Sequence, residues 1–245
     1  MLILLPPSEG KKAIRRGRPL ELTELSLPEL TPTRQRVLDA TVAAAGAPNA
    51  LQLFGVAPGL AEDVAGNRAL RTRPAARADR VFSGVLYAAL GLADLDAAGK
   101  RRAARRLLIS SALFGALRPA DRIPDHRLAI GARLPGLGAL TAVWRAALTE
   151  PLNTLAGNGL VVDCRSAGYA AMWRPPRADG WVQVTVPGAT HHAKHTRGLV
   201  AGALCQRSAA PGSAAELADA LTGEFRVDLT RATPTSPWQL AVTAR

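Results

Sequence analysis

The sequence predicts an α/β or α+β fold, because short apolar runs of strand length alternate along the chain with longer segments of helical periodicity. Several of the strand-like runs are followed directly by polar loops, an arrangement typical of sheets that bind a ligand at the ends of their strands. The chain has 245 residues, 48% of them apolar, and can bury one sizeable core. Both a single large domain and a lobed one are compatible with that size.

The first half of the chain begins with a strand. The apolar run from Met1 to Leu5 is too short for a helix and is typical of a buried strand. An irregular segment over residues 11–30 precedes a helix that starts at Thr31-Pro32 and stops at Gly46. The other elements expected here are helices over 59–70 and 94–106 and a buried strand with its exit over 107–115.

The second half repeats the alternation of strand and polar loop. Ser213 and Glu216 predict a capping box at the start of its last helix. The stretch 181–188 predicts a strand, and the helix after it is expected to begin near Thr196. The remaining expected elements are a helix over 138–157 ending at Gly157, a strand over 160–164, a helix over 165–173, and one or two final strands over 224–230 and 238–244.

The charge of the chain favours a polyanionic partner. Lys and Arg number 31 against 19 Asp and Glu, which gives a net charge of +12. Only four of the basic residues are lysines, and abundant Ala and Arg would also follow from a GC-rich coding bias, so charge alone is weak support for nucleic acid. The basic cluster that could hold phosphates of duplex DNA without sequence selectivity consists of Lys100, Arg101, Arg102, Arg105 and Arg106.

Several classes of protein are disfavoured by the sequence. Cys164 and Cys205 are the only cysteines, so neither a disulfide scaffold nor a Cys-based zinc site is expected. The start of the chain lacks the pattern of a signal peptide, and no run approaches the roughly 18 apolar residues of a membrane span. We expect a cytoplasmic monomer without a cofactor and without a membrane partner.

A pair of histidines raises the possibility of a metal site. His191 and His195 are four residues apart and would share one face of a helix. No carboxylate lies in this segment, and Gly188 indicates a loop, where such spacing has little meaning. The sequence therefore predicts no metal.

The loop PPSEGKK, residues 6–12, could be mistaken for a phosphate-binding loop. A Walker loop needs a glycine five residues before its Gly-Lys pair, and Leu5 stands at that place. The two prolines also remove amides that would contact the phosphates. The loop keeps Ser8, Glu9 and Lys11 as polar groups at a strand exit.

Polar side chains follow four predicted strands. If these strands run parallel in one sheet, their exits meet at one edge, and we expect Lys11 to face Lys194 and Arg197 across a cleft there. A cationic, hydrogen-bonding set of this kind suits an anion, although solvated loop charges and helix caps give the same pattern. In chain order, the exits offer Ser8, Glu9 and Lys11; Arg118, Asp121, His126 and Arg127; Asp163, Arg165, Ser166 and Tyr169; and Lys194, His195 and Arg197.

Four blocks of the sequence carry a resemblance to a known family. MLILLPPSEGK, LFGALRP-D-I--HRL--G-RL, VVDCRSAGYAAMW and AKHTRG resemble, in order and spacing, segments of the YaaA family of peroxide-stress proteins. The similarity extends over nearly the whole chain. It implies a single compact domain over residues 1–245, with a mixed sheet flanked by helices, a positively charged cleft and a helix-hairpin-helix-like element. It also implies protection against hydrogen peroxide, restraint of free intracellular iron, and DNA binding.

The resemblance carries over to individual positions. It places on the family's blocks Ser8 and Lys11; Arg118, Asp121 and Arg127; Ser166 and Tyr169; and Lys194, Arg197 and Gly198. The sequence departs from the family where Gly168 and Ala171 replace an acidic residue and a lysine of many relatives, and where HHAKH replaces an aromatic-rich lead-in. These departures indicate a divergent, actinobacterial-like branch, in which the ligand can differ.

Two functions remain open from the sequence. The first is a stress-protective module that binds DNA through an arginine stripe and limits iron-driven damage. The second is an enzyme acting on a small anionic or nucleotide-like ligand, with Lys194, Glu9, Ser166 and Tyr169 as catalytic candidates. A broad stripe of Arg, which this sequence has, favours the first, and convergence of uncharged polar groups such as Ser8, Ser166 and Tyr169 in a deep pocket would favour the second. Because the family resemblance implies DNA binding, we prefer the first. The residues predicted to bind the anion in either case are Ser8, Lys11, Arg118, Asp121, Arg127, Arg165, Ser166, Lys194 and Arg197.

Overall fold

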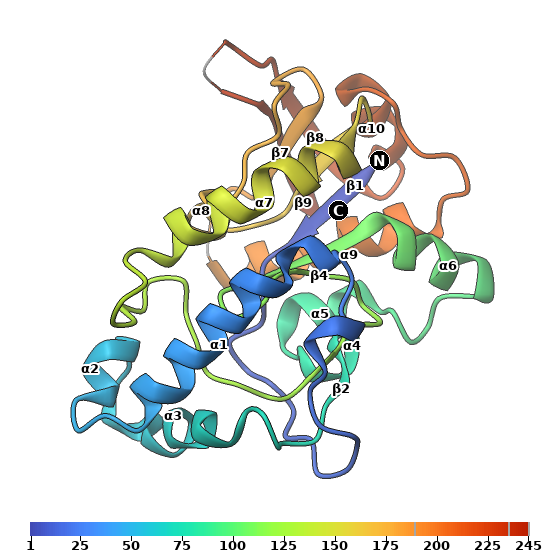
Figure 1. Cartoon of the computed structure of the whole chain (residues 1–245). Helices are drawn as coiled ribbons and strands as arrows, with labels where there is room; N and C mark the ends of the chain where they lie inside the picture. The colour runs from blue at the N-terminus through green and yellow to red at the C-terminus, as the bar shows by residue number, and fades with distance from the viewer. Residues whose placement is uncertain (189, 235, 245) are drawn as a thin grey trace.

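The computed structural model describes residues 1–188, 190–234 and 236–244. Its parallel strands are β1 (Leu2–Leu5), β3 (Leu107–Ser111), β6 (Val161–Asp163), β7 (Trp181–Thr185) and β9 (Trp238–Ala244), and its antiparallel edge strands are β4 (Gly115–Leu117) and β8 (Phe225–Thr230). They form one mixed sheet in the order β4-β3-β1-β6-β7-β9-β8, flanked by helices (Figure 1). The predicted fold class is confirmed.

The central strands follow the rule for sheets that are covered on both faces. All four residues of β1 are buried, and Leu4 of β1 pairs with Leu108 on one side and Asp163 on the other. Strands buried on both faces read as continuous apolar runs, which is why this strand is visible in the sequence. Because β1, β3, β6 and β7 are parallel, their carboxyl ends lie on one edge of the sheet.

Ten α-helices lie among the described residues (Figure 1). They are α1 (Thr31–Ala45), α2 (Ala50–Phe54), α3 (Ala61–Gly66), α4 (Ala78–Val81), α5 (Val85–Leu90), α6 (Ala97–Arg106), α7 (Leu140–Ala156), α8 (Ala167–Ala170), α9 (Thr190–Gln206) and α10 (Ala214–Leu221). A separate two-stranded sheet pairs β2 (Ala76–Arg77) with β5 (Arg122–Ile123). No helix among residues 1–188, 190–234 and 236–244 is long and apolar enough to cross a membrane.

Helix boundaries marked by glycine are confirmed, whereas other boundaries are corrected. α1 ends at Gly46 and α7 ends at Gly157, as predicted. The helix expected over 59–70 is α3 flanked by 3₁₀ turns, and the helix expected over 165–173 is only the four residues of α8. α9 begins at Thr190 and not near Thr196, and Gly188, with φ of +91°, lies two residues before it.

The capping box before α10 is present with one change of partner. The Ser213 hydroxyl accepts a hydrogen bond from the Glu216 amide at 3.2 Å. The Glu216 carboxylate accepts from the amide of Gly212 at 2.9 Å, one residue before the expected donor. Both interactions still satisfy amides at the start of the helix.

Helices α5 and α9 pack closely because α9 carries glycine at the contact. A Cβ atom at Gly198 would lie 2.2 Å from the carbonyl oxygen of Leu86, and one at Gly202 would lie 2.8 Å from that of Leu90. Both distances are below van der Waals contact, so only glycine permits this approach. The packing fixes the start of α5 beside the middle of α9.

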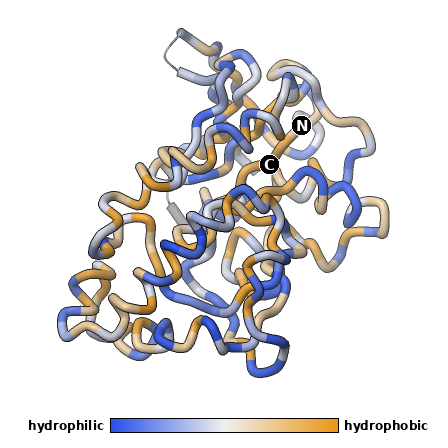
Figure 2. The backbone as a smooth tube through the Cα atoms, viewed as in Figure 1, coloured by the Kyte–Doolittle hydropathy of each residue, from blue (hydrophilic) through white to orange (hydrophobic). Residues whose placement is uncertain are grey.

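The outer helix α6 is the most polar of the longer helices. Figure 2 shows it as a hydrophilic stretch at the edge of the molecule, while β1 is hydrophobic throughout. The helix expected over 94–106 begins later, at Ala97, because Asp96 caps it by accepting from the amide of Gly99 at 2.5 Å. α6 packs against α9.

Candidate functional site

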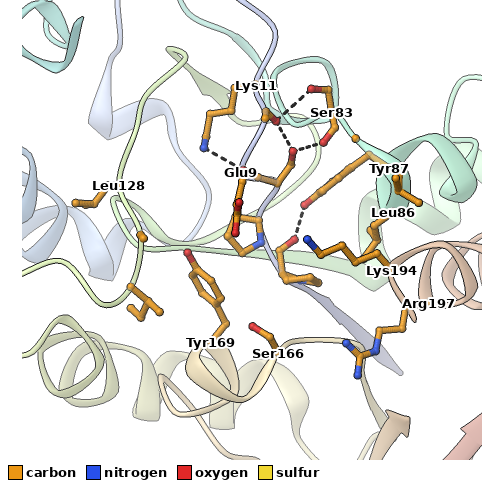
Figure 3. A pocket seen from close by; sticks show the side chains of 18 of the residues that line it. Glu9, Lys11, Ser83, Leu86, Tyr87, Leu128, Ser166, Tyr169, Lys194 and Arg197 are labelled. Carbon is orange, nitrogen blue, oxygen red and sulfur yellow. Dashed lines mark hydrogen bonds between the residues drawn. The ribbon is translucent and has the colours of Figure 1, made fainter. Parts of the chain in front are cut away.

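A pocket of about 520 Å³ lies beyond the carboxyl ends of the parallel strands (Figure 3). Its walls come from the loop after β1, the start of α5, the loop 127–130, the start of α8 and the first turns of α9. The volume is in the range of pockets that enclose small molecules. The predicted site residues that line it are Ser8, Glu9, Lys11, Arg127, Ser166, Tyr169, Lys194 and Arg197.

The loop after β1 is fixed by the segment before α5. The Ser83 hydroxyl donates to the carbonyl of Gly10 at 3.1 Å, and the Ser8 hydroxyl contacts the carbonyls of Gly10 and Ser83. The Tyr87 hydroxyl donates to the carbonyl of Pro6 at 2.7 Å, and burial raises its pKa well above the usual value, so it stays protonated. The opening loop is therefore a rigid wall of the pocket.

Lys11 lies at the inner side of this loop. Its Nζ donates to the carbonyl of Ser8 at 3.0 Å and lies 5.6 Å from the centre of the Phe82 ring. Burial, followed by the charge of Arg127, lowers the pKa of Lys11 to about 8. Behind it, His126 is buried, and burial together with the charge of Lys11 holds its pKa well below the usual value. His126 is therefore neutral.

Arg127 and Tyr169 form the wall opposite α9. The backbone of Arg127 is held at both polar groups by Asn67, which donates to its carbonyl at 2.7 Å and accepts from its amide at 3.0 Å. The Arg127 guanidinium donates to the carbonyl of Glu9 at 3.3 Å. Burial raises the pKa of Tyr169 to about 12, so its hydroxyl is a hydrogen-bond donor at neutral pH.

The opposite side of the pocket carries two cations on α9. The Arg197 Nε donates to the carbonyl of Val184 at 3.1 Å, which holds this side chain against the end of β7. The Lys194 and Ser166 side chains are exposed, and neither makes a hydrogen bond or ion pair within the described part of the chain. In Figure 3 both groups lie below and to the right of Lys11, separated from it. They are available to a ligand.

Three predicted anion-binding residues lie outside the pocket because the protein uses their polar groups internally. Arg118 donates to the carbonyls of Arg105 at 2.7 Å and Leu107 at 3.0 Å. Asp121 is buried and accepts from the amide of Ser26 at 3.0 Å. Arg165 forms a buried ion pair with Asp163 at 2.7 Å and donates to the carbonyl of Trp173 at 2.8 Å. Each holds neighbouring segments of the fold together.

The basic cluster on α6 divides into two sets. Arg102 donates to the carbonyls of Cys205 and Gln206, and Arg106 donates to those of Leu204, Arg207 and Ser208. These carbonyls lie at the C-terminal end of α9, where helices leave acceptors unsatisfied. Lys100, Arg101 and Arg105 are exposed. Only this second set has its charged ends free of such contacts among the described residues.

Sequence reasoning missed one wall of the pocket. Ser83, Gly84 and Tyr87 come from the start of α5, and an apolar strip of Leu86, Leu128 and Ile130 was not assigned to the site. One feature of the sequence indicates this wall, namely the Ser83-Gly84 pair that follows Val81-Phe82. Gly84 has a φ of +104°, a backbone conformation that favours glycine. Nothing in the sequence distinguishes the apolar strip of Leu86, Leu128 and Ile130 from residues of the hydrophobic core.

No cysteine, and no histidine among the described side chains, lines this pocket. Cys164 and Cys205 are buried, and burial raises their pKa values to about 12 and about 11. The predicted loop around His195 is helical, while the side chain of His191 lies outside the described residues. Within the described chain, no group of three or more His, Cys, Asp or Glu could hold a metal ion.

Comparison with known proteins gives consistent matches over most of the chain. The family model described as peroxide stress protein YaaA matches residues 1–230. A UPF0246 protein of Streptomyces coelicolor is 47% identical over 231 residues, covering 90% of this chain and 89% of the relative. A UPF0246 protein of Corynebacterium efficiens is 37% identical over 237 residues, covering 91% and 92%.

Proposed function

The chain belongs to the YaaA family of peroxide stress proteins, and from this premise we propose that it binds a small anionic, nucleotide-like ligand in the pocket at the strand ends. The observation that supports this most is the convergence of Ser166 and Tyr169 with Lys194 and Arg197 around one cavity. Cations alone would serve a polyanion, but hydroxyl donors inside a concave site serve a small ligand with several polar atoms.

The two kinds of wall indicate which ligand fits. Lys194, Arg197 and Ser166 offer cationic and hydroxyl donors to a phosphate or carboxylate. Leu86, Leu128 and Ile130 offer an apolar surface to a ring or a hydrocarbon part. A phosphate attached to a base or another ring satisfies both, whereas inorganic phosphate satisfies only the first.

The test is ligand-dependent thermal stability. AMP should raise the melting temperature of the wild-type protein more than equimolar inorganic phosphate or adenosine, because it uses both walls; a concentration 100 times Kd adds about 2.7 kcal/mol. Lys194→Ala should lose this effect. Lys100→Ala removes the same charge from an exposed site on α6 and should keep it. A melting temperature that no nucleotide changes, or an effect equal in both variants, would contradict the proposal.

The DNA-binding, iron-limiting role implied by the family resemblance is the second candidate. It is supported by the net charge of +12 and by the exposed Lys100, Arg101 and Arg105. Replacing these three by Ala should weaken binding to duplexes of any sequence alike, and affinity should fall steeply between about 50 and 200 mM salt. Under this candidate, the wild-type protein should also reduce cleavage of duplex DNA by ferrous iron and peroxide, and the triple variant should not.

A further inference from the structure

The position of Lys11 differs from that of the other lysines. Its Nζ is enclosed between the Phe82 ring and the loop carbonyl of Ser8, yet the side chain lines the pocket. A neutral carbonyl is its only hydrogen-bond acceptor, and no carboxylate in the described residues lies within ion-pair distance. Lys12, its neighbour, has an exposed side chain and does not line the pocket.

The charges around Lys11 come from several elements. Arg127 from the loop 127–130 opposes its protonation, while Glu9, Asp125 and the more distant Asp63 favour it. Neutral His126 adds no charge on the inner side. With burial as the largest effect and a pKa of about 8, roughly a quarter of the amine is unprotonated near pH 7.5, against about one part in a thousand for an ordinary lysine.

We propose that Lys11 is a reactive amine that forms an imine with an aldehyde or ketone group of an anionic ligand held in this pocket. This inference rests on the proposed anion pocket. The amine nitrogen attacks the carbonyl carbon, a C–N bond forms, and the carbonyl oxygen leaves as water with two protons that the nitrogen gives up. The step needs no oxidant or reductant.

Neighbouring groups suit the proton transfers of this step. The Tyr169 hydroxyl stays protonated and lines the same cavity, so it can donate a hydrogen bond to the carbonyl oxygen. The Glu9 side chain lines the cavity beside it and can carry a proton from nitrogen to oxygen. Arg127, Lys194 and Arg197 line the same cavity and offer cationic groups to the ligand's anionic part.

The experiment uses pyridoxal 5′-phosphate as a probe, because it joins an aldehyde to a phosphate. The full-length protein is incubated with one equivalent at pH 7.5, reduced with borohydride, digested and analysed by mass spectrometry. Lys11 should carry most of the label, at least tenfold more than Lys12, its sequence neighbour, or exposed Lys100. The N-terminal amine is measured in parallel, because burial and the charge of Arg106 lower its pKa as well.

Two variants separate the possible outcomes. Lys11→Arg keeps the charge and should lose the imine absorbance and the label, while Lys12→Arg should keep both; circular dichroism verifies that each is folded. Equal label on the surface lysines, or label mainly on Lys194 or the N-terminus, would overturn the inference.

The same samples distinguish this inference from the anion pocket. If AMP raises the melting temperature but Lys11 is not labelled, the pocket stands and the reactive amine is rejected. If Lys11 is labelled but AMP neither protects it nor stabilises the protein, the amine is reactive and the nucleotide-like ligand is rejected.

Discussion

Basic side chains lie near both ends of α9, and the protein uses these side chains differently at the two ends. At the N-terminal end, Lys194 and Arg197 face a cavity, and Lys194 makes no hydrogen bond or ion pair within the described residues. At the C-terminal end, Arg102 and Arg106 of α6 donate to five backbone carbonyls. The positive charge at the first end is available to a ligand, whereas the guanidinium groups at the second end are already hydrogen-bonded to the backbone.

This difference shows why a count of basic residues says little about binding. A guanidinium that completes a helix end is half-buried and already has acceptors, so a phosphate gains little from it. An exposed ammonium group beside a cavity, such as that of Lys194, can bind a phosphate without breaking a hydrogen bond within the protein. The basic cluster on α6 looked uniform in the sequence, and its positions divide between these two states.

The largest expected effect is at the middle of α9. Gly198→Val would place side-chain atoms where the backbone of α5 lies, since even a Cβ would be 2.2 Å from the Leu86 carbonyl oxygen. We expect a loss of about 3 kcal/mol or more of unfolding free energy in urea titrations. Gly131→Ala is the control, because no atom lies within 4 Å of its would-be Cβ. Equal stability of the two variants would show that α9 and α5 do not pack as described.

The next largest effect is expected at the C-terminal end of α9. Replacing Arg102 and Arg106 together by Ala leaves five carbonyls without these donors and should cost about 2–4 kcal/mol in denaturant unfolding. Arg101→Ala with Arg105→Ala removes the same charge from exposed positions and should change stability by less than about 0.5 kcal/mol. If both double variants lose equal stability, the two sets of arginines do not differ in role.

A smaller effect of opposite sign is expected at Lys11. Its folded pKa of about 8 lies below the usual 10.5, so the unfolded state binds more protons between these values and the folded state is penalised below about pH 8. Lys11→Met should therefore stabilise the protein at pH 7 by about 1 kcal/mol, after loss of its hydrogen bond to Ser8. The difference should shrink as pH rises from 8 to 10.5. Urea midpoints over this range provide the measurement, and a constant difference would contradict the assignment.

The smallest effect sharpens the contrast at the open end. Lys194→Ala should change stability without ligand by less than about 0.5 kcal/mol, because the exposed side chain contributes no described contact. Differential scanning calorimetry without and with AMP measures both states. A large loss without ligand would place Lys194 among the cations that are bonded within the protein.

The parts of the fold predicted well have strong local signals. The buried strand β1 is an uninterrupted apolar run, and α1 and α7 end at glycines, so pattern and propensity agree there. The start of α9 was misplaced because Gly188 indicates a turn but does not show how soon a helix follows. The helix predicted over 165–173 was too long, since α8 spans only Ala167–Ala170.

The candidate site could be predicted where residues follow parallel strands directly. Ser8 and Ser166 each lie three residues after a parallel strand, and topology alone brings such positions to one edge. Lys194 follows β7 at a greater distance, in the first turns of α9. Arg118 and Arg165 could not be separated from them, because the carbonyls and the carboxylate that engage these side chains become neighbours only in the folded chain. The wall from α5 was missed since it follows no strand of the main sheet.

The burial of both cysteines has a consequence for a member of a peroxide stress family. Hydrogen peroxide oxidises the thiolate and not the thiol, and the raised pKa values of Cys164 and Cys205 leave almost no thiolate at neutral pH. Both sulfurs are also closed off from solvent by the core. While the protein is folded, neither cysteine is therefore open to oxidation by hydrogen peroxide.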